Sequence, residues 1–352
     1  MGELRACPVT GVHVVLPGDV DDPARTSGGN VYDRRVCDEL ATDLDVHELP
    51  VPGTWPHPDD AARAELARAL AAVPDGGPVL LDGLVACAVP DVVAAQADRL
   101  RLTVLVHLPL GDEAGLDPET AAELTGRERA TLHSAAAVVA TSPWAARRIA
   151  DVHGVSAHVA TPGVDPGPVT PAGDGSRLIS VGSVTPTKGH DLLVEALALV
   201  VGLDWTCRIV GPLVRDPDHV AVLRATIARR HLDDRVQLTG PEADVTWTGA
   251  DLLVLPSRTE TYAMVVTEAL AHGIPVLAAD VGGVADTLGR AADGSVPGLL
   301  VPPGNAAALA AALRRWLDDA DLRETARRSA LARRAELDGW EVTARCLAKV
   351  LL

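Results

Sequence analysis

Short apolar segments alternate with amphipathic segments along most of the chain. A brief run of apolar residues is typical of a strand buried on both faces of a sheet, whereas apolar residues that recur every three or four positions indicate a helix. Strands that alternate with helices predict an α/β fold built on parallel sheets. The expected strands are 12–16, 46–49, 79–81, 102–106, 136–140, 157–160, 178–181, 205–211, 236–240, 251–256 and 274–278. The expected helices are 31–41, 59–72, 90–100, 119–134, one from 143, 191–200, 220–230, 263–272, 306–319, 322–337 and 340–352.

A segment rich in Pro and Gly divides this pattern into two halves. Residues 161–176 contain four Pro and four Gly, which makes them the clearest linker in the chain. A second such segment, residues 294–304, is expected to form a turn. The sequence therefore predicts two domains that meet near residue 165.

The most informative segment is 251–283, which we interpret as a strand–loop–helix–strand unit. Its polar residues gather in the loop and the first helical turns, where ligands bind in open parallel sheets. Glu260 lies in the loop and Glu268 in the helix, so their carboxylates could accept hydrogen bonds from sugar hydroxyls, while free N–H groups at the helix start could bind phosphates. The alternative is that the two acids only offset the helix macrodipole. The N–H groups expected to be exposed are those of Tyr262, Ala263 and Met264.

Three further sites are candidates because of where they lie in the pattern. Gly28 and Gly29 precede a predicted helix and can bring backbone amides close to an anion, although a plain turn explains them equally well. His107 follows the carboxyl end of a strand, but a lone His is more often structural. Lys188 is one of two Lys among 31 basic residues and lies between a strand and a helix, which suggests a phosphate contact rather than a solvated surface charge.

Two familiar nucleotide-binding patterns are missing from the sequence. No G-x-G-x-x-G follows the first strand, which disfavours a nicotinamide enzyme, and no G-x-x-x-x-G-K-[ST] is present, which disfavours a P-loop.

Residues 251–283 resemble the retaining glycosyltransferases of family 4. The similarity lies in P-S-x-x-E-x7-E, followed by E-A-L-A-H-G-I-P-V and D-V-G-G. The resemblance implies the GT-B fold, in which two Rossmann-like β/α/β domains face a cleft and the C-terminal helix crosses back to the N-terminal domain. The acceptor-binding domain would then comprise residues 1–165 plus about 338–352, and the nucleotide-sugar-binding domain residues 166–337.

The resemblance also implies roles for individual residues. Glu260 would contact the donor sugar, Glu268 the ribose hydroxyls and Lys188 the diphosphate, while His107 would reach the transferred sugar. His107, Glu260 and Lys188 are therefore the expected catalytic residues. The remaining donor contacts would come from Gly29, Ser183, Arg258, Tyr262, Ala263 and Met264, and the loop facing the acceptor and the phosphates would be Gly28, Gly29 and Asn30.

The chain departs from the family pattern at two places. The usual E-G-F-G is Glu260-Thr261-Tyr262-Ala263 here, so both glycines are replaced and the aromatic residue is kept as tyrosine. The Arg of the usual G-R-x-x-x-x-K-G is Ser183, so half of the diphosphate clamp is missing. Arg258 or an Arg of the first domain is the candidate to replace it.

Composition narrows the classes of partner. The formal net charge of −17 and the pI of about 5.0 argue against nucleic acid or an anionic membrane surface as the main partner. The N-terminal residues lack the apolar core of a signal peptide, and no run is long enough for an integral membrane span, so we expect a cytoplasmic protein. The sequence leaves open whether the chain forms a homodimer.

The cysteines and the D-x-D motifs provide no support for a metal site. Cysteines 7, 37, 87, 207 and 346 show no metal-ligand spacing, so buried free thiols are expected. Asp43-x-Asp45, Asp216-x-Asp218 and Asp319-x-Asp321 spell a metal motif of another transferase fold, but such spacings arise by chance in a chain with 48 acidic residues.

The function implied by the resemblance is that of a retaining glycosyltransferase. It would move a sugar from a UDP-, GDP- or dTDP-sugar to a hydroxylated small molecule, without a metal or another cofactor. Two alternatives remain: a sugar-nucleotide epimerase or hydrolase on the same fold, and a non-catalytic nucleotide-sugar-binding protein.

Overall fold

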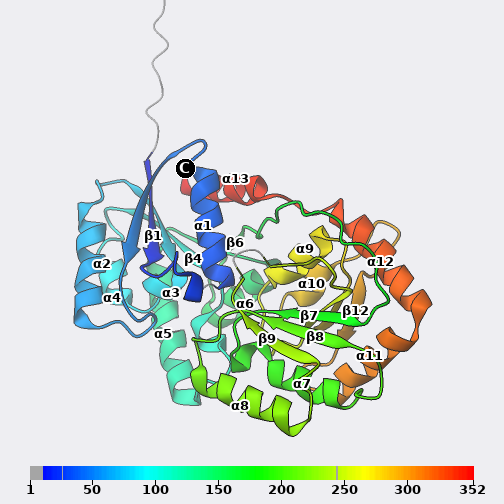
Figure 1. Ribbon diagram of the computed structural model, residues 1–352. Coiled ribbons are helices and arrows are strands. Elements are labelled where there is room, and N and C mark those ends of the chain that lie inside the picture. Colours follow the sequence, from blue (N-terminus) through cyan, green and yellow to red (C-terminus); the bar gives the residue numbers. More distant parts are fainter. Residues whose placement is uncertain (1–10, 26, 243–244) are drawn as a thin grey trace, which may run out of the picture.

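The computed structural model describes residues 11–25, 27–242 and 245–352. In this part of the chain the strands form two parallel six-stranded sheets with helices packed around them, which is the predicted α/β architecture (Figure 1). The first sheet has the strand order β2-β1-β3-β4-β5-β6, and the second has the order β12-β11-β10-β7-β8-β9.

The first domain contains the first sheet and the helices that follow its strands. Its strands are β1 (Gly11–Pro17), β2 (Asp45–Val51), β3 (Pro78–Asp82), β4 (Arg101–Val106), β5 (Ala137–Ala140) and β6 (His158–Val159). Its helices are α1 (Gly28–Leu40), α2 (Asp60–Ala72), α3 (Gly83–Ala86), α4 (Pro90–Ala94), α5 (Pro118–Ser134) and α6 (Pro143–His153), and short 3-10 turns lie at Pro23–Arg25 and Leu110–Asp112.

The second domain repeats this arrangement. Its strands are β7 (Arg177–Val181), β8 (Thr206–Val210), β9 (Val236–Gly240), β10 (Leu252–Leu255), β11 (Val276–Ala279) and β12 (Gly298–Val301). Its helices are α7 (His190–Ala198), α8 (Pro217–Arg229), α9 (Met264–Ala271), α10 (Val284–Leu288), α11 (Ala306–Asp318) and α12 (Ala320–Arg334), with a 3-10 turn at Pro186–Lys188.

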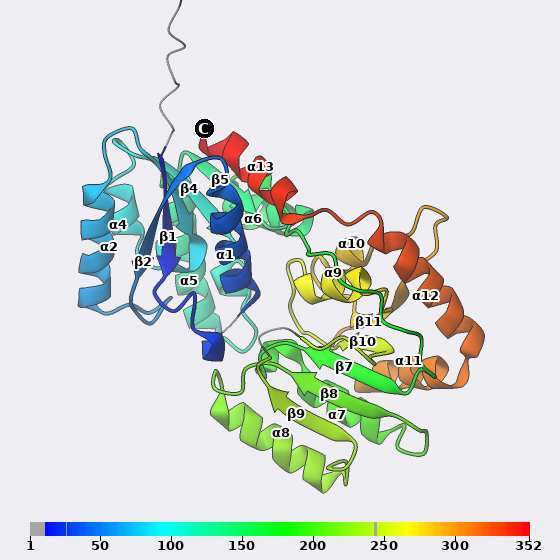
Figure 2. The same cartoon turned by 45° about the horizontal axis from the view of Figure 1, so that its top comes forward.

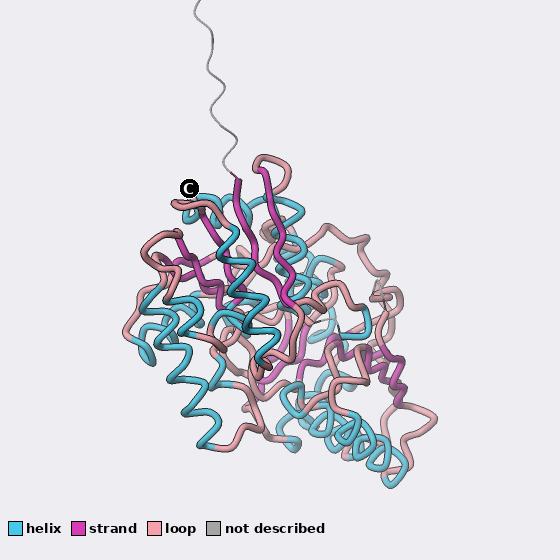
Figure 3. Tube along the Cα trace, turned by 90° about the vertical axis from the view of Figure 1, so that its left-hand side faces the viewer, coloured by secondary structure: helices cyan, strands magenta, loops and turns pink. Residues whose placement is uncertain are grey.

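The central strands are apolar because both faces of each sheet are covered. Every residue of β3 and of β10 is buried, and Figure 3 shows the strands running between helices. The strand order reverses between β1 and β3 in the first sheet and between β7 and β10 in the second. Such reversals open a crevice at the carboxyl ends of the strands, which is where ligands bind in open α/β sheets.

The C-terminal helix α13 (Trp340–Leu351) packs on the first domain, as the GT-B resemblance implied. It lies beside α1 and away from α12 (Figure 2), and the rings of Trp340 and Tyr32 are 5.7 Å apart. The two connections between the domains touch, because Val164 donates a backbone hydrogen bond to Asp338 O at 3.0 Å. Gly163 is needed at this crossing, since a Cβ there would lie 2.3 Å from the backbone nitrogen of Trp340.

Several predicted boundaries were wrong. Residues 294–304 are not only a turn, because Gly298–Val301 pairs with β11 as the edge strand β12. Helices α3 and α10 were not expected, and α4 ends at Ala94 rather than residue 100. Helix α1 begins at Gly28 rather than Val31, because the Ser27 hydroxyl caps it by accepting a hydrogen bond from Asn30 N.

Other sequence features have plain structural roles. Cys37, Cys87 and Cys207 are buried free thiols and Cys346 is a partly buried one, whereas Cys7 lies outside the described residues. Asp216 and Asp319, from two of the D-x-D motifs, are the N-caps of α8 and α12. None of the helices in the described ranges combines the length and the apolar character needed to cross a bilayer.

Candidate functional site

The loops after β7 and β10 bring Lys188 and Glu260 together. Lys188 ends the 3-10 turn after β7, and its Nζ lies 2.7 Å from Glu260 Oε1. The Ser257 hydroxyl donates a second hydrogen bond to the same oxygen at 2.8 Å. Glu260 is 8% exposed, so its buried charge is neutralised by a cation and a hydroxyl. Two residues that the sequence placed at separate strand ends thus form one charged pair.

Arg258 is part of the scaffold that holds this pair. Its guanidinium binds both carboxylate oxygens of Asp191, at 2.9 and 2.6 Å, and donates to Pro186 O at 2.6 Å. These bonds tie the loop after β10 to the turn that carries Lys188. The predicted donor contact of Arg258 remains a prediction, because its guanidinium is engaged within the protein in this structure.

The diglycine of the D-V-G-G motif lets the Glu260 loop lie against its neighbour. Gly282 has φ of +56°, and a Cβ there would lie 1.6 Å from Glu260 O. Gly283 N donates to the same carbonyl at 3.2 Å. A side chain at residue 282 would displace the loop, so these glycines fix the position of Glu260.

Helix α9 begins with an alanine in a conformation that favours glycine. Ala263 has φ of +69° and ψ of +68°, in the left-handed region, and it turns the chain into the helix. Among the described residues, no acceptor pairs with the backbone N–H groups of Tyr262, Ala263 or Met264. The start of α9 therefore has N–H groups without a partner among the described residues, and anion binding there remains a prediction.

Glu268 lies one turn into α9 and is partly buried. In the described part of the chain, no side chain or backbone group donates a hydrogen bond to its carboxylate or forms an ion pair with it. Burial raises the pKa of Glu268 to about 7. An acid that is buried without a protein partner is available to a ligand.

The first domain contributes Gly28, Gly29 and His107 to the same region. A Cβ at Gly28 would lie 3.8 Å from Met264 Sδ, so the start of α1 is close to the start of α9 across the two domains. A Cβ at Gly29 would lie 3.4 Å from the His107 ring. Asn30 is occupied in the loop, since its side chain accepts from Ser27 Oγ and donates to Asp19 O.

His107 is held by two carboxylates that the sequence analysis did not single out. Its Nε2 lies 2.8 Å from Asp33 Oδ1 and 3.5 Å from Asp82 Oδ2, and both acids are nearly fully buried. Burial opposes the charge of His107, but the negative charge of Asp33 outweighs it, so the pKa of His107 is raised. Burial and the neighbouring Asp33 raise the pKa of Asp82 to about 8. Asp82 directly follows a predicted strand, a signal that could have revealed it.

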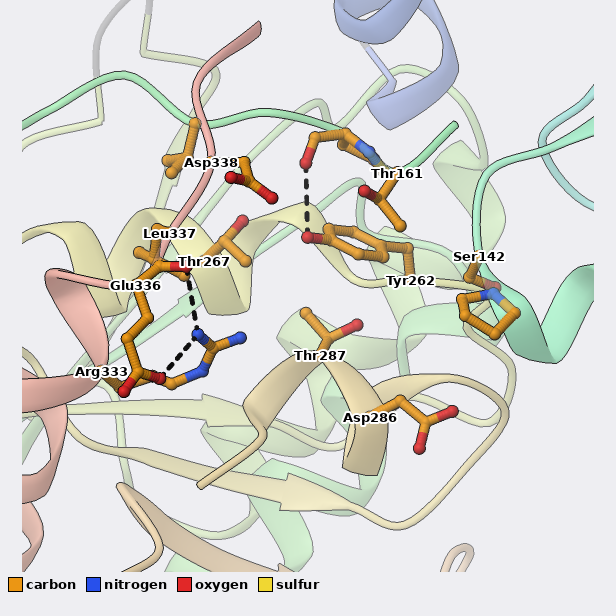
Figure 4. Close-up of a pocket in the computed structure, with 13 residues that line it drawn as sticks. Ser142, Thr161, Tyr262, Thr267, Asp286, Thr287, Arg333, Glu336, Leu337 and Asp338 are labelled. Carbon is orange, nitrogen blue, oxygen red and sulfur yellow. Dashed lines mark hydrogen bonds and ion pairs between the residues drawn. The ribbon is translucent and has the colours of Figure 1, made fainter. Parts of the chain in front are cut away.

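Tyr262 contacts the linker between the domains. Its hydroxyl donates to Pro162 O in the linker at 3.3 Å, and it lines a cavity of about 190 Å³ between the domains together with Ser142, Thr287 and Arg333 (Figure 4). None of His107, Lys188 and Glu260 lines this cavity, so it lies at the hinge and apart from the predicted chemistry.

Comparison with known proteins identifies most of the second domain. Residues 168–333 match the family described as Glycosyl transferases group 1. This segment is a glycosyl transferases group 1 domain. It contains Ser183, Lys188, Arg258, Glu260 and Glu268, whereas Gly28, Gly29, Asn30 and His107 lie in the other domain.

Curated relatives of the group 1 domain extend the similarity into the first domain. A D-inositol 3-phosphate glycosyltransferase from Jonesia denitrificans is 32% identical over 255 residues, which are 64% of this chain and 59% of that protein. A protein of the same name from Kineococcus radiotolerans is 33% identical over 264 residues, 66% of this chain and 60% of that protein. The chain thus spans about three fifths of the length of these relatives.

Solved structures match the whole fold around the group 1 domain. Sucrose-phosphate synthase from Thermosynechococcus elongatus has a TM-score of 0.78 at 21% identity, covering 97% of this chain and 98% of that chain. Anabaena HepE in complex with UDP and glucose has a TM-score of 0.76 at 18% identity, covering 97% and 99%. These matches confirm the predicted two-domain GT-B fold.

Proposed function

We propose that this protein is a retaining glycosyltransferase that moves a sugar from a nucleotide-diphosphate sugar to a hydroxyl group of a small acceptor. The observation that carries the proposal is the set of groups around the start of α9. An ammonium group, two carboxylates and open backbone N–H groups meet there, opposite Gly28 of the other domain. These are the groups that bind a diphosphate and several hydroxyls at once.

Lys188 and the start of α9 would stabilise the leaving diphosphate. The ammonium group of Lys188 has three donors and gives one to Glu260 at 2.7 Å, which leaves others for phosphate oxygens. The positive end of the α9 dipole adds to this charge. Because negative charge grows on the diphosphate as the sugar leaves, fixed cationic groups lower the barrier without requiring a metal ion.

Glu260 and Glu268 would orient the donor. Both hydrogen bonds that Glu260 accepts from described residues end on Oε1, so Oε2 is available for a hydroxyl of the sugar. The unpaired carboxylate of Glu268 would accept from the ribose hydroxyls. The acceptor would approach from the first domain, on the side of His107.

The first experiment is a thermal-shift screen against UDP-, GDP- and dTDP-sugars, followed by transfer assays with and without a chelator. UDP-glucose is the first donor to test because the HepE structure contains UDP and glucose, and inositol 3-phosphate is among the first acceptors because of the relatives' name. We expect transfer in the presence of chelator, with an anomeric configuration in the product, measured by NMR, that matches the donor. Inversion at the anomeric carbon would contradict a retaining mechanism.

The two lysines of the chain provide a matched pair of variants. Lys188→Gln keeps a hydrogen-bond donor for the buried carboxylate of Glu260 but removes the positive charge. This variant should lower kcat roughly 100-fold or more with the fold intact. Lys349→Gln, on the exposed side of α13, should leave kcat unchanged.

Each contrary outcome points to one alternative. Unchanged turnover in Lys188→Gln would disprove the role of this site. Epimerised or hydrolysed donor in the absence of any acceptor would indicate an epimerase or hydrolase. Donor binding without turnover in any acceptor mixture would indicate a non-catalytic binding protein.

A further inference from the structure

Asp33, Asp82 and His107 form a buried cluster at the carboxyl edge of the first sheet. Asp33 comes from α1, Asp82 ends β3 and His107 follows β4, so three separate elements converge on one point. The two acids are 3% and 4% exposed, which means that no solvent surrounds their charges. Buried carboxylates are retained only where they have a partner or a function.

The distances within the cluster fit a shared proton. Nε2 of His107 and Oδ1 of Asp33 are 2.8 Å apart, a normal hydrogen-bond length. Two ligands bound to one divalent ion at about 2.1 Å are usually about 3 Å or more from each other. Within the described ranges, these three residues are the group whose ligand atoms lie near enough to one another to hold a metal ion. The 2.8 Å distance between Nε2 and Oδ1 favours a hydrogen bond between them instead.

A proton on Asp82 accounts for a second observation. Asp33 Oδ2 is buried and accepts no hydrogen bond from the described residues. Burial and the nearby Asp33 raise the pKa of Asp82, and both therefore favour its protonated form. A protonated Asp82 supplies the donor that the buried carboxylate of Asp33 otherwise lacks.

The opposite edge of the His107 ring faces solvent. Within the described part of the chain no group bonds Nδ1, and Nδ1 is not among the buried polar atoms that lack a partner. The ring packs edge-on against Tyr32, with centroids 5.1 Å apart, and a Cβ at Gly29 would lie in van der Waals contact with it at 3.4 Å. The ring therefore has one orientation, with Nε2 inward and Nδ1 outward.

We propose that Asp33, together with a protonated Asp82, is a positioning residue that keeps His107 in its imidazolium form. The Nδ1–H of this imidazolium points toward the bound nucleotide sugar. This inference rests on the proposed function. A charged N–H donor beside the start of α9 would bind an oxygen of the sugar or of the diphosphate, and it would be lost when His107 deprotonates.

The groups that face His107 determine how it titrates. The charge of Asp33 from α1 raises its pKa, and Asp82 at the end of β3 adds to this effect only in its ionised form. Tyr32, also on α1, is buried and uncharged at neutral pH, and the Thr141 hydroxyl after β5 donates to the backbone carbonyl of His107 at 3.4 Å. No other described titratable group contributes to the shift. Loss of the Asp33 charge must therefore lower the pKa of His107.

The test compares the unaltered protein with Asp33→Asn over a range of pH. The two independent readouts are the pH dependence of kcat and the titration midpoint of His107 measured by NMR. The amide keeps an acceptor for Nε2–H but removes the charge, so the alkaline limb of kcat should move to lower pH by about one unit or more. NMR of ¹⁵N-labelled histidine, with His107→Gln to assign the signal, should show the His107 midpoint falling by the same amount. The donor KM at pH 6 should change little. Asp38→Asn, on the exposed face of α1, is the matched control and should move neither readout.

The NMR titration separates this inference from the proposed function, because it needs no turnover. In the unaltered protein the midpoint of His107 should lie above the usual value of about 6.5. A midpoint below that value, an unmoved midpoint in Asp33→Asn, or a Zn²⁺- or Mg²⁺-induced shift of His107 that Asp33→Asn abolishes would each overturn the inference. A protein that shows the expected titration but transfers no sugar refutes only the proposed function.

Discussion

At the scale of single residues, Glu268 is the most informative side chain of the second domain. Glu268 is partly buried and its carboxylate accepts no hydrogen bond from the described residues, so its presence there needs a reason. Its surroundings raise its pKa to about 7 rather than neutralise it with a cation. We infer that the missing partner is the ligand.

The raised pKa of Glu268 gives a prediction for the pH dependence of donor binding. The acid is ionised above about pH 7, and the carboxylate is the better acceptor for ribose hydroxyls, so the donor KM should fall as the pH rises from 6 to 8. Glu268→Gln should raise KM about tenfold at pH 8 and remove this pH dependence. Initial-rate kinetics against donor concentration measure both effects.

The control for this prediction is Glu324→Gln, on an exposed face of α12. It should leave the pH dependence of KM as it is in the unaltered protein. A KM that does not change between pH 6 and 8 in the unaltered protein would exclude the role of Glu268.

The sequence could predict which residues lie at the strand ends but not which of them touch. The sequence pointed to Lys188, Glu260 and His107 because each follows a predicted strand, and to Glu268 because it lies in the first turns of a predicted helix. That Lys188 pairs with Glu260 depends on two loops far apart in the sequence. Asp33 lies within a helix, where an acid ordinarily faces solvent, so only the fold reveals that it binds His107.

At the scale of elements, the start of α9 has a left-handed backbone conformation although the residue there is alanine. The replaced glycine is Ala263, which nevertheless has φ of +69°. The left-handed region costs a residue with a Cβ roughly 1 kcal/mol, so the surrounding contacts must hold this turn. The replacement of glycine by alanine therefore does not prevent a left-handed turn at residue 263.

This strain predicts the effect of glycine at residue 263. Ala263→Gly relieves the strained conformation, which offsets the loss of a buried methyl group, so the free energy of unfolding should change by less than about 0.5 kcal/mol. Ala269→Gly, in the middle of α9, relieves no strained conformation and should lower the free energy of unfolding by about 1 kcal/mol or more. Urea denaturation measures both values. Equal losses in the two variants would mean that residue 263 is not strained.

The strand that the sequence did not predict lies at the edge of its sheet. Gly298–Val301 is short, begins with glycine and follows a proline, and only one of its residues is fully buried. Its conformation comes from pairing with β11, not from its own pattern. The central strands, which are buried on both faces, have the continuous apolar runs that made them predictable.

At the scale of the whole molecule, the donor loop is connected to the hinge between the domains. Tyr262 follows Glu260 by two residues, and its hydroxyl donates to Pro162 O in the linker. A phenylalanine, the residue usual in this motif, could not form that bond. The protein therefore has a direct hydrogen bond between its donor loop and the connection along which the domains would rotate.

Removal of this bond should loosen the hinge without unfolding either domain. Tyr262→Phe deletes one oxygen, so we expect a loss of stability of about 0.5–1.5 kcal/mol at most. Amide hydrogen exchange should become faster at Val164, which pairs with Asp338 across the two linkers.

Tyr32→Phe is the control for the hinge prediction, because its hydroxyl donates to Ala160 O at 2.9 Å within the first domain. It should lower the stability of that domain and leave exchange at Val164 unchanged. If exchange at Val164 responds equally to both variants, the Tyr262 bond does not restrain the hinge.

The crossing of α13 also affects how the protein is made. The apolar face of α13 shares a core cluster with Tyr32, Val36 and Leu40 of α1, so the first domain contains a helix that follows the second domain in the sequence. A ribosome synthesises residues 340–351 after the whole of the second domain. The apolar face of α1 therefore stays uncovered, and the first domain incomplete, until translation has passed through the whole second domain.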